Sequence, residues 1–165
     1  ASTMERTIKL IAHRGNINGS NPDRENTVPY IEEAIKRGFD VEIDIRAIEY
    51  KEPERQAYIS PYAYVLGHDG GETEVGYEWL LLHSEKLWVH CKDLTSLRAL
   101  CGTPLNYFWH QEDDFTLTSK NIIWTYPLKN VTDKSVIVCF TQEEAKFWNG
   151  ESQIFGICCD WVGEI

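Results

Sequence analysis

Two acidic residues alternate with branched aliphatic residues in one short segment of the chain. The run Val41-Glu42-Ile43-Asp44-Ile45-Arg46 predicts a β-strand that carries Glu42 and Asp44 on one face and the aliphatic side chains on the other. On an antiparallel sheet the acidic face would meet water. Inside a barrel it would be buried, and two buried carboxylates require a neutralising proton or cation. Oxygen ligands of this kind suit a hard metal ion such as Mg²⁺ or Ca²⁺.

Histidines follow two further apolar runs. His13-Arg14-Gly15 ends the run that begins at Ile8, and His68-Asp69-Gly70 ends the run that begins at Tyr64. Barrel enzymes place their chemistry at the carboxyl ends of strands. A single histidine is more often structural than catalytic, but two at equivalent strand ends near an acidic pair favour a functional site.

A fourth segment adds a possible nitrogen ligand and a cation. The run Leu87-Trp88-Val89-His90-Cys91-Lys92 alternates again, so that His90 and Lys92 share one face of a predicted strand with Trp88. The alternation places Cys91 on the opposite face.

The elements that must position these residues are short apolar runs separated by turn signals, without an internal repeat. We expect strands at residues 8–12, 41–48, 64–67, 87–91, 106–109, 121–125, 135–139 and 154–159. The clearest helix has Asn26 as its N-cap and ends before Gly38, and weaker helices are expected at 94–100 and 142–148. The remaining connections are too short or too polar for full helices, and 50–61 is expected to be an inserted, exposed loop.

Composition predicts one folded domain over residues 4–165; residues 1–3 precede Met4 and are interpreted as an expression remnant. The formal net charge of −10 argues against binding of nucleic acid, and no apolar run is long enough to insert into a membrane. The five cysteines lack a CxxC spacing and are expected to be reduced core residues. We therefore expect a soluble, cytoplasmic protein of unknown oligomeric state that binds a small molecule.

Four short motifs, in order along the chain, resemble those of the glycerophosphodiester phosphodiesterases and related phosphatidylinositol-specific phospholipase C-like barrels. They are His13-Arg14-Gly15, Glu25-Asn26-Thr27, Glu42-x-Asp44 and His68-Asp69. A weaker likeness is the terminal run 156–160, which is similar to the last strand of the family. The resemblance covers most of the chain and implies an α/β fold of the TIM type, a trimmed β/α barrel in which some outer helices are missing or replaced by loops.

The resemblance also implies a metal-dependent phosphodiesterase that hydrolyses a small glycerophosphodiester-like substrate. Glu42, Asp44 and His90 would hold the divalent metal ion, which would bind a phosphate oxygen and lower the pKa of an attacking hydroxyl or water. Arg14 and Lys92 would hold the remaining phosphate charge. His13 and His68 would share the roles of general acid and general base.

Two features depart from the family pattern. The third metal ligand is usually glutamate where this chain has His90, a softer donor that would favour Mn²⁺ or Zn²⁺ over Ca²⁺. Family members are also usually longer. Three alternatives therefore stay open: an inactive phosphate-binding barrel, a sphingomyelinase D-like lyase that releases a cyclic phosphate, and a zinc site made from His90, Cys91 and Cys158 or Cys159.

An aromatic and polar stretch, residues 108–114, follows the predicted strand at 106–109 and is expected at the rim of the site. Trp109 and His110 are candidates for substrate contact, and Trp124 and Trp161 are candidates for the same pocket. For Glu25 and Asn26 we favour structural roles, with Asn26 capping the helix and Glu25 orienting Arg14 or its loop.

Overall fold

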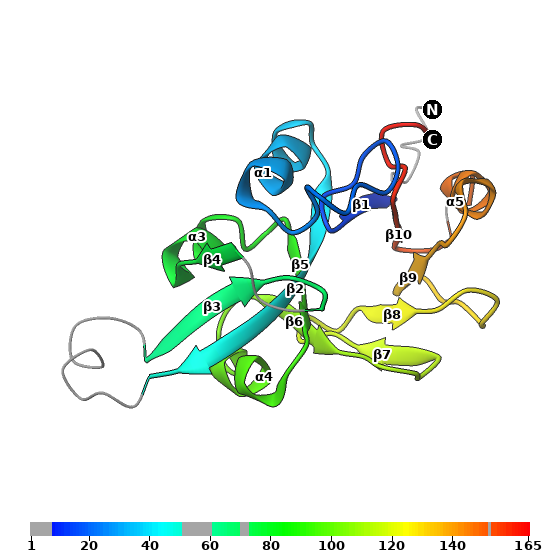
Figure 1. Ribbon diagram of the computed structural model, residues 1–165. Helices are drawn as coiled ribbons and strands as arrows, with labels where there is room; N and C mark the ends of the chain where they lie inside the picture. Colours follow the sequence, from blue (N-terminus) through cyan, green and yellow to red (C-terminus); the bar gives the residue numbers. More distant parts are fainter. Residues whose placement is uncertain (1–7, 51–60, 70–72, 152) are drawn as a thin grey trace, which may run out of the picture.

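The computed structural model describes residues 8–50, 61–69, 73–151 and 153–165, which form an α/β protein with a mixed ten-stranded sheet (Figure 1). The α/β class is confirmed. Most of the expected loop at 50–61, the remnant at 1–3 and the end of the His68-Asp69-Gly70 motif lie outside the described residues.

Seven of the described strands form a continuous parallel ladder in the order β6-β5-β2-β1-β10-β9-β8. They are β1 (Lys9–His13), β2 (Asp40–Glu49), β5 (Leu87–Cys91), β6 (Asn106–Trp109), β8 (Ile123–Thr125), β9 (Ser135–Val138) and β10 (Gly156–Cys159). Each coincides with one of the apolar runs expected from the sequence. Because parallel strands point their carboxyl ends the same way, the ends of β1, β2 and β5 are brought to one edge.

The other described strands are antiparallel: β3 (Tyr62–Leu66), β4 (Thr73–Val75) and β7 (Phe115–Leu117). A strand at the run 64–67 is therefore confirmed, but it runs antiparallel to β2 and lies outside the parallel ladder. The ladder between β1 and β2 ends at Glu42, so the distal half of β2 has a free edge, and β3 folds back onto it with Leu66 opposite Ile45. The N–H of Gly67 donates to the carbonyl of Asp44 at 3.1 Å. This bond holds the next residue, His68, near the acidic pair although β3 is antiparallel to β2.

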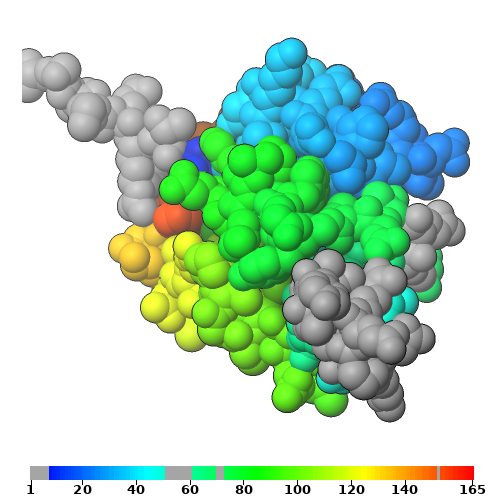
Figure 2. All heavy atoms as spheres, turned by 90° about the vertical axis from the view of Figure 1, so that its left-hand side faces the viewer, coloured from blue at the N-terminus to red at the C-terminus, as the bar shows by residue number. Residues whose placement is uncertain are grey.

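Four helices are described: α1 (Val28–Lys36), α3 (Tyr77–Leu82), α4 (Leu94–Leu100) and α5 (Gln142–Asn149). The side chains of Asp93 and Thr141 cap α4 and α5. The prediction that Asn26 caps α1 is wrong, because Thr27 occupies the N-cap position and the Asn26 side chain bonds to Asp44 instead. The short helix α3, not expected from the sequence, lies beside α1 (Figure 2), where Trp79 Nε1–H donates to Glu32 at 3.4 Å.

The alternating strands bury a separate core on each face of the sheet. The larger core contains the strand residues Val41, Ile43 and Ile45 and packs against the helices. The smaller core lies on the opposite face and contains Ile11, Trp88, Phe108, Ile122, Trp124, Val136 and Cys158. Glu42 and Asp44 project to this second face, so the acidic face is buried.

No closed barrel is detected, because no strand ladder in the described part of the chain joins β6 to β7 or β8. A hydrogen bond of 2.8 Å from Ser119 N–H to the carbonyl of Tyr107 connects β6 to the turn between β7 and β8. Among the described helices, none has the length and apolar character needed to cross a membrane.

Two isoleucines on β2 test this packing. Ile43 is fully buried, whereas the side chain of Ile48 is 56% exposed near the end of the same strand. We expect Ile43→Ala to lower the free energy of unfolding by about 2–5 kcal/mol and Ile48→Ala to change it by about 0.5 kcal/mol or less. Urea denaturation of both variants measures the difference, and equal effects would contradict the described orientation of β2.

Candidate metal centre

A cavity of about 360 Å³ opens at the carboxyl ends of the parallel strands. It brings together nine of the eleven residues that the sequence analysis named as site candidates. They are His13, Arg14, Glu42, Asp44, His68, His90, Lys92, His110 and Trp124. The strand register explains this convergence: Glu42 lies opposite His13 of β1, and Asp44 lies opposite His90 of β5.

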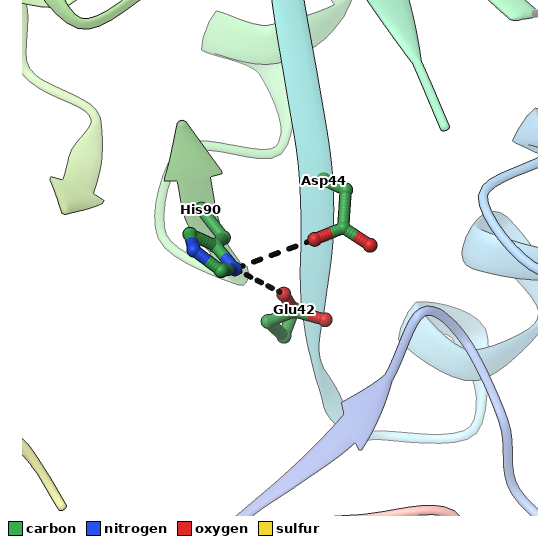
Figure 3. Close-up of side chains that lie close together, drawn as sticks. All are labelled: Glu42, Asp44 and His90. Carbon is green, nitrogen blue, oxygen red and sulfur yellow. Dashed lines mark ion pairs between the residues drawn. The ribbon is translucent and has the colours of Figure 1, made fainter. Parts of the chain in front are cut away.

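Glu42, Asp44 and His90 form a compact group that could hold a metal ion (Figure 3). One ligand atom from each residue lies within 4.8 Å of the other two. His90 Nδ1 is 3.6 Å from Glu42 Oε2 and 3.4 Å from Asp44 Oδ1. The two acidic residues are only 2% and 1% exposed, so their charges require a partner inside the protein.

The ring of His90 is held so that Nδ1 faces the carboxylates. Its Nε2 lies 3.0 Å from the carbonyl oxygen of His110, and because a carbonyl only accepts, Nε2 carries the proton. The ring also stacks on Phe108, with centroids 5.0 Å apart and planes within 10°. A metal-binding histidine commonly donates its other N–H to a carbonyl in this way. Two carboxylates and one imidazole nitrogen therefore fit a divalent ion, including Mn²⁺ or Zn²⁺.

The electrostatics of the group follow from burial and from its neighbours. Burial opposes the charged form of His90, but Asp44 and Glu42 outweigh it and raise the pKa of His90 to about 9. Burial also opposes ionisation of Asp44, yet His90, Arg14 and Asn26 hold the pKa of Asp44 well below its usual range. Both groups are therefore charged near neutral pH. Protonated His90 balances negative charge of the carboxylates that a bound metal ion would balance in its place.

A polar network fixes the other side of Asp44. Its Oδ2 accepts from Asn26 Nδ2 at 3.1 Å and lies 3.1 Å from Arg14 Nε, which leaves Oδ1 for His90. Asn26 Oδ1 also accepts from the Asp44 backbone N–H at 3.0 Å. The expected contact between Glu25 and Arg14 is confirmed by an ion pair of 3.2 Å. The role of Asn26 was missed because its pairing with Asp44 spans 18 positions in sequence.

His13 is oriented by a carboxylate that the sequence analysis did not select. His13 Nδ1 lies 2.8 Å from Asp160 Oδ1, and His13 Nε2 lies 3.9 Å from Glu42 Oε1. Burial opposes the imidazolium, but Asp160 and Glu42 together raise the pKa of His13. The sequence signals for Asp160 were its position directly after the last expected strand and the weak likeness of the run 156–160 to the family's last strand. In the structure Cys159 pairs with Ala12, which places Asp160 beside His13.

His68 and Lys92 also line the cavity. His68 Nδ1 lies 2.8 Å from Asp69 Oδ1, and the His68 side chain is 43% exposed. Lys92 lies two positions after His90 and is partly buried. His68 is therefore accessible to solvent at the cavity wall.

Two predicted substrate contacts lie elsewhere, and one alternative metal site is not assembled. Trp109 is 37% exposed and Trp161 packs against the core on the helix side; neither lines the cavity. Trp109 and His110 are adjacent in an extended segment, so their side chains point in opposite directions and only His110 reaches the cavity.

Among the described residues, the group of three potential ligands that forms is Glu42, Asp44 and His90, without a cysteine. Cys91 faces the helix-side core, opposite His90.

Comparison of the chain with models of protein families, with curated proteins and with solved structures gives no match.

Metal binding is tested by removing one carboxylate charge at a time. We expect Glu42→Gln or Asp44→Asn to weaken binding of Mn²⁺ by at least about tenfold, because each removes an anionic oxygen ligand from the buried group. Glu49→Gln is the matched control, since Glu49 is exposed on the same strand. Isothermal titration calorimetry measures the affinities, and an equal loss in the control would argue against this centre.

The Asp160 contact predicts a change in the titration of His13. Asp160→Asn removes the acceptor that favours the imidazolium, so the pKa of His13 should fall. NMR titration of the His13 ring protons in metal-free protein measures the shift, with Asp23→Asn on the surface as a control. An unchanged pKa of His13 would show that the bond to Asp160 does not form in solution.

Proposed function

We propose that the protein is a divalent-metal-dependent phosphodiesterase that hydrolyses small, glycerophosphodiester-like substrates. One observation carries the proposal: a single cavity combines a buried group of potential metal ligands with two cationic side chains and two histidines. This is the set of groups that phosphodiester hydrolysis requires, namely charge neutralisation of the phosphate and two proton transfers. The sequence resemblance to glycerophosphodiester phosphodiesterases supports the same reaction.

We also propose that the sheet curls into a trimmed β/α barrel. The parallel ladder has β6 at one end and β8 at the other, yet Phe108 of β6 and Trp124 of β8 have ring centroids only 4.6 Å apart. Two ends of a sheet meet only if the sheet wraps around, and the bond from Ser119 to Tyr107 spans the same gap. The metal-ligand group then lies at the top of the barrel interior, where barrel enzymes hold their active sites.

A bound divalent ion would be held by Glu42, Asp44 and His90 and would supply charge neutralisation at a phosphate oxygen. Arg14 lies beside this group: its Nη1 donates to Glu25, and its Nε lies 3.1 Å from Asp44 Oδ2 as an ion pair. A guanidinium has five N–H donors, so others remain for a phosphate oxygen. Lys92 provides a second positive charge on the cavity wall. These residues would orient the diester and stabilise the negative charge that develops during hydrolysis.

The two histidines have the same arrangement of partners. His13 Nδ1 faces Asp160 and His68 Nδ1 faces Asp69, each at 2.8 Å, so Nε2 is the atom left for proton transfer in both rings. One Nε2 would accept a proton from the attacking oxygen while the other protonates the leaving alcohol. Such a division of labour contributes about 10²–10⁴-fold to the rate.

Hydrolysis of bis-p-nitrophenyl phosphate and of glycerophosphocholine tests the reaction class. The protein is stripped of metal and resupplied with Mg²⁺, Ca²⁺, Mn²⁺ or Zn²⁺. We expect metal-dependent turnover that falls by about 10²–10⁴-fold in His13→Ala and in His68→Ala, because each loses one proton transfer. His83→Ala is the matched control, since His83 lies at the end of α3 against Trp79 and outside the cavity.

Other results would change the assignment. Normal turnover in the His13 and His68 variants would contradict the two-histidine mechanism. A cyclic phosphate that persists as the product would favour the lyase alternative over hydrolysis. Binding of metal and phosphate without turnover of any diester would favour the inactive phosphate-binding barrel.

A further inference from the structure

The two histidines assigned to proton transfer are held in different ways. Asp160, the partner of His13, is itself fixed by Asn16, whose Nδ2 donates to the same carboxylate at 3.0 Å. Asp69, the partner of His68, is the next residue in the chain, and its side chain is 96% exposed. A contact between two adjacent, solvated side chains contributes little to their position relative to the rest of the protein. The place of His68 in the cavity is therefore set by its main chain.

The main chain that carries His68 leaves β3 at a glycine. Gly67 has a φ of 154°, in the region that favours glycine, and it has no side chain to anchor this segment. Two hydrogen bonds in the described structure join the segment to β2, which runs beside β3 (Figure 1). The N–H of Gly67 donates to the carbonyl of Asp44 at 3.1 Å, and Nη2 of Arg46 donates to the carbonyl of His68 at 2.9 Å. Arg46 is therefore the side chain that holds the main chain of His68.

Arg46 has no other interaction that accounts for its position. It follows Asp44 by two residues on β2, so it projects to the same face of the sheet as the acidic pair. In the part of the chain that the structure describes, Arg46 forms no ion pair and does not line the cavity. Its Nε is buried without a hydrogen-bond partner among the same residues. Such a group lowers stability, so its presence requires an explanation.

We propose that Arg46 is a positioning residue, which holds the His68 main chain so that the ring stays within reach of the metal centre. This inference rests on the proposed function for the role of His68 in proton transfer. Arg46 acts through His68 and does not touch the substrate. A hydrogen bond from a charged guanidinium is stronger than one between neutral groups, which suits it to fix a segment that begins at a glycine.

The position of Arg46 on β2 makes this contact useful for catalysis. The same strand carries the potential metal ligands Glu42 and Asp44, two and four residues before Arg46. One rigid strand thereby sets both the metal centre and the distance of His68 from it. Proton transfer requires heavy atoms within about 3 Å of each other, and a misplacement of about 1 Å can lower the rate by about 10²-fold.

Replacement of Arg46 by methionine tests the effect on turnover. Arg46→Met keeps a long, unbranched side chain and removes the donor. The substrate is glycerophosphocholine with Mn²⁺-loaded protein, because its alkoxide leaving group needs both proton transfers. We expect kcat to fall by about 10–10²-fold, whereas KM and the dissociation constant of Mn²⁺ stay unchanged. Arg46→Lys retains a donor and should recover part of the loss.

The matched control is Arg98→Met. Arg98 is exposed on α4, bonds to the hydroxyl of Tyr62 at 2.6 Å and lies outside the cavity. Its replacement should leave kcat at the wild-type value.

A double-mutant cycle assigns the effect to His68. In a His68→Ala background, Arg46→Met should not lower kcat further, because the ring that Arg46 positions is already absent. A general structural role for Arg46 would lower kcat by the same factor in both backgrounds. Equal factors in the two backgrounds, or a normal kcat in Arg46→Met, would overturn the positioning role.

NMR relaxation tests the contact without turnover. The N–H of Asp69 belongs to the same peptide unit as the His68 carbonyl, so its order parameter reports on the bond to Arg46. In Arg46→Met it should fall from about 0.85 toward about 0.6, whereas Arg98→Met should leave it unchanged. The amide of His90 on β5 should keep its value in both variants, which shows that the sheet is intact. An unchanged Asp69 amide in Arg46→Met would overturn the inference.

The two kinds of measurement distinguish this inference from the proposed function. Absence of turnover in wild type, together with a mobile Asp69 amide in Arg46→Met, would overturn the phosphodiesterase and leave the contact of Arg46 with His68 standing. Turnover in wild type, together with an unchanged Asp69 amide in that variant, would overturn the positioning role and leave the phosphodiesterase standing.

Discussion

Two carboxyl groups, Glu42 and Asp44, are buried side by side on β2, and the structure around them depends on compensating their negative charge. An isolated buried carboxylate would be too costly to remain ionised. His90 contacts both, Arg14 and Asn26 hold the second oxygen of Asp44, and these partners come from three different segments. Packing of the sheet and assembly of the site are therefore coupled.

Two residues in the loop between β1 and α1 have a left-handed backbone conformation that places their side chains on Asp44. Arg14 has a φ of 58° and Asn26 a φ of 59°, both in the left-handed region, which asparagine tolerates better than arginine. The conformation is compensated by ion pairs of Arg14 with Glu25 and Asp44 and by two hydrogen bonds between Asn26 and Asp44. Local strain held by a polar network is typical of functional sites.

The cavity has a charged half and an aromatic half. The strand ends that carry charge, β1, β2 and β5, are neighbours in the ladder, whereas the aromatic side chains of His110, Tyr126 and Phe140 follow β6, β8 and β9. A hydrogen bond from His90 Nε2 to the carbonyl of His110 connects the two halves.

The sequence by itself determined where the strands of the parallel ladder lie, the acidic face of β2 and most residues of the cavity, because alternation and strand ends are local patterns. It did not reveal that β3 runs antiparallel, since the free edge of β2 exists only after β1 and β2 have paired. The roles of Asn26 and Asp160 were likewise decided by tertiary structure. Their partners, Asp44 and His13, are distant in sequence, and such contacts arise only when the sheet is assembled.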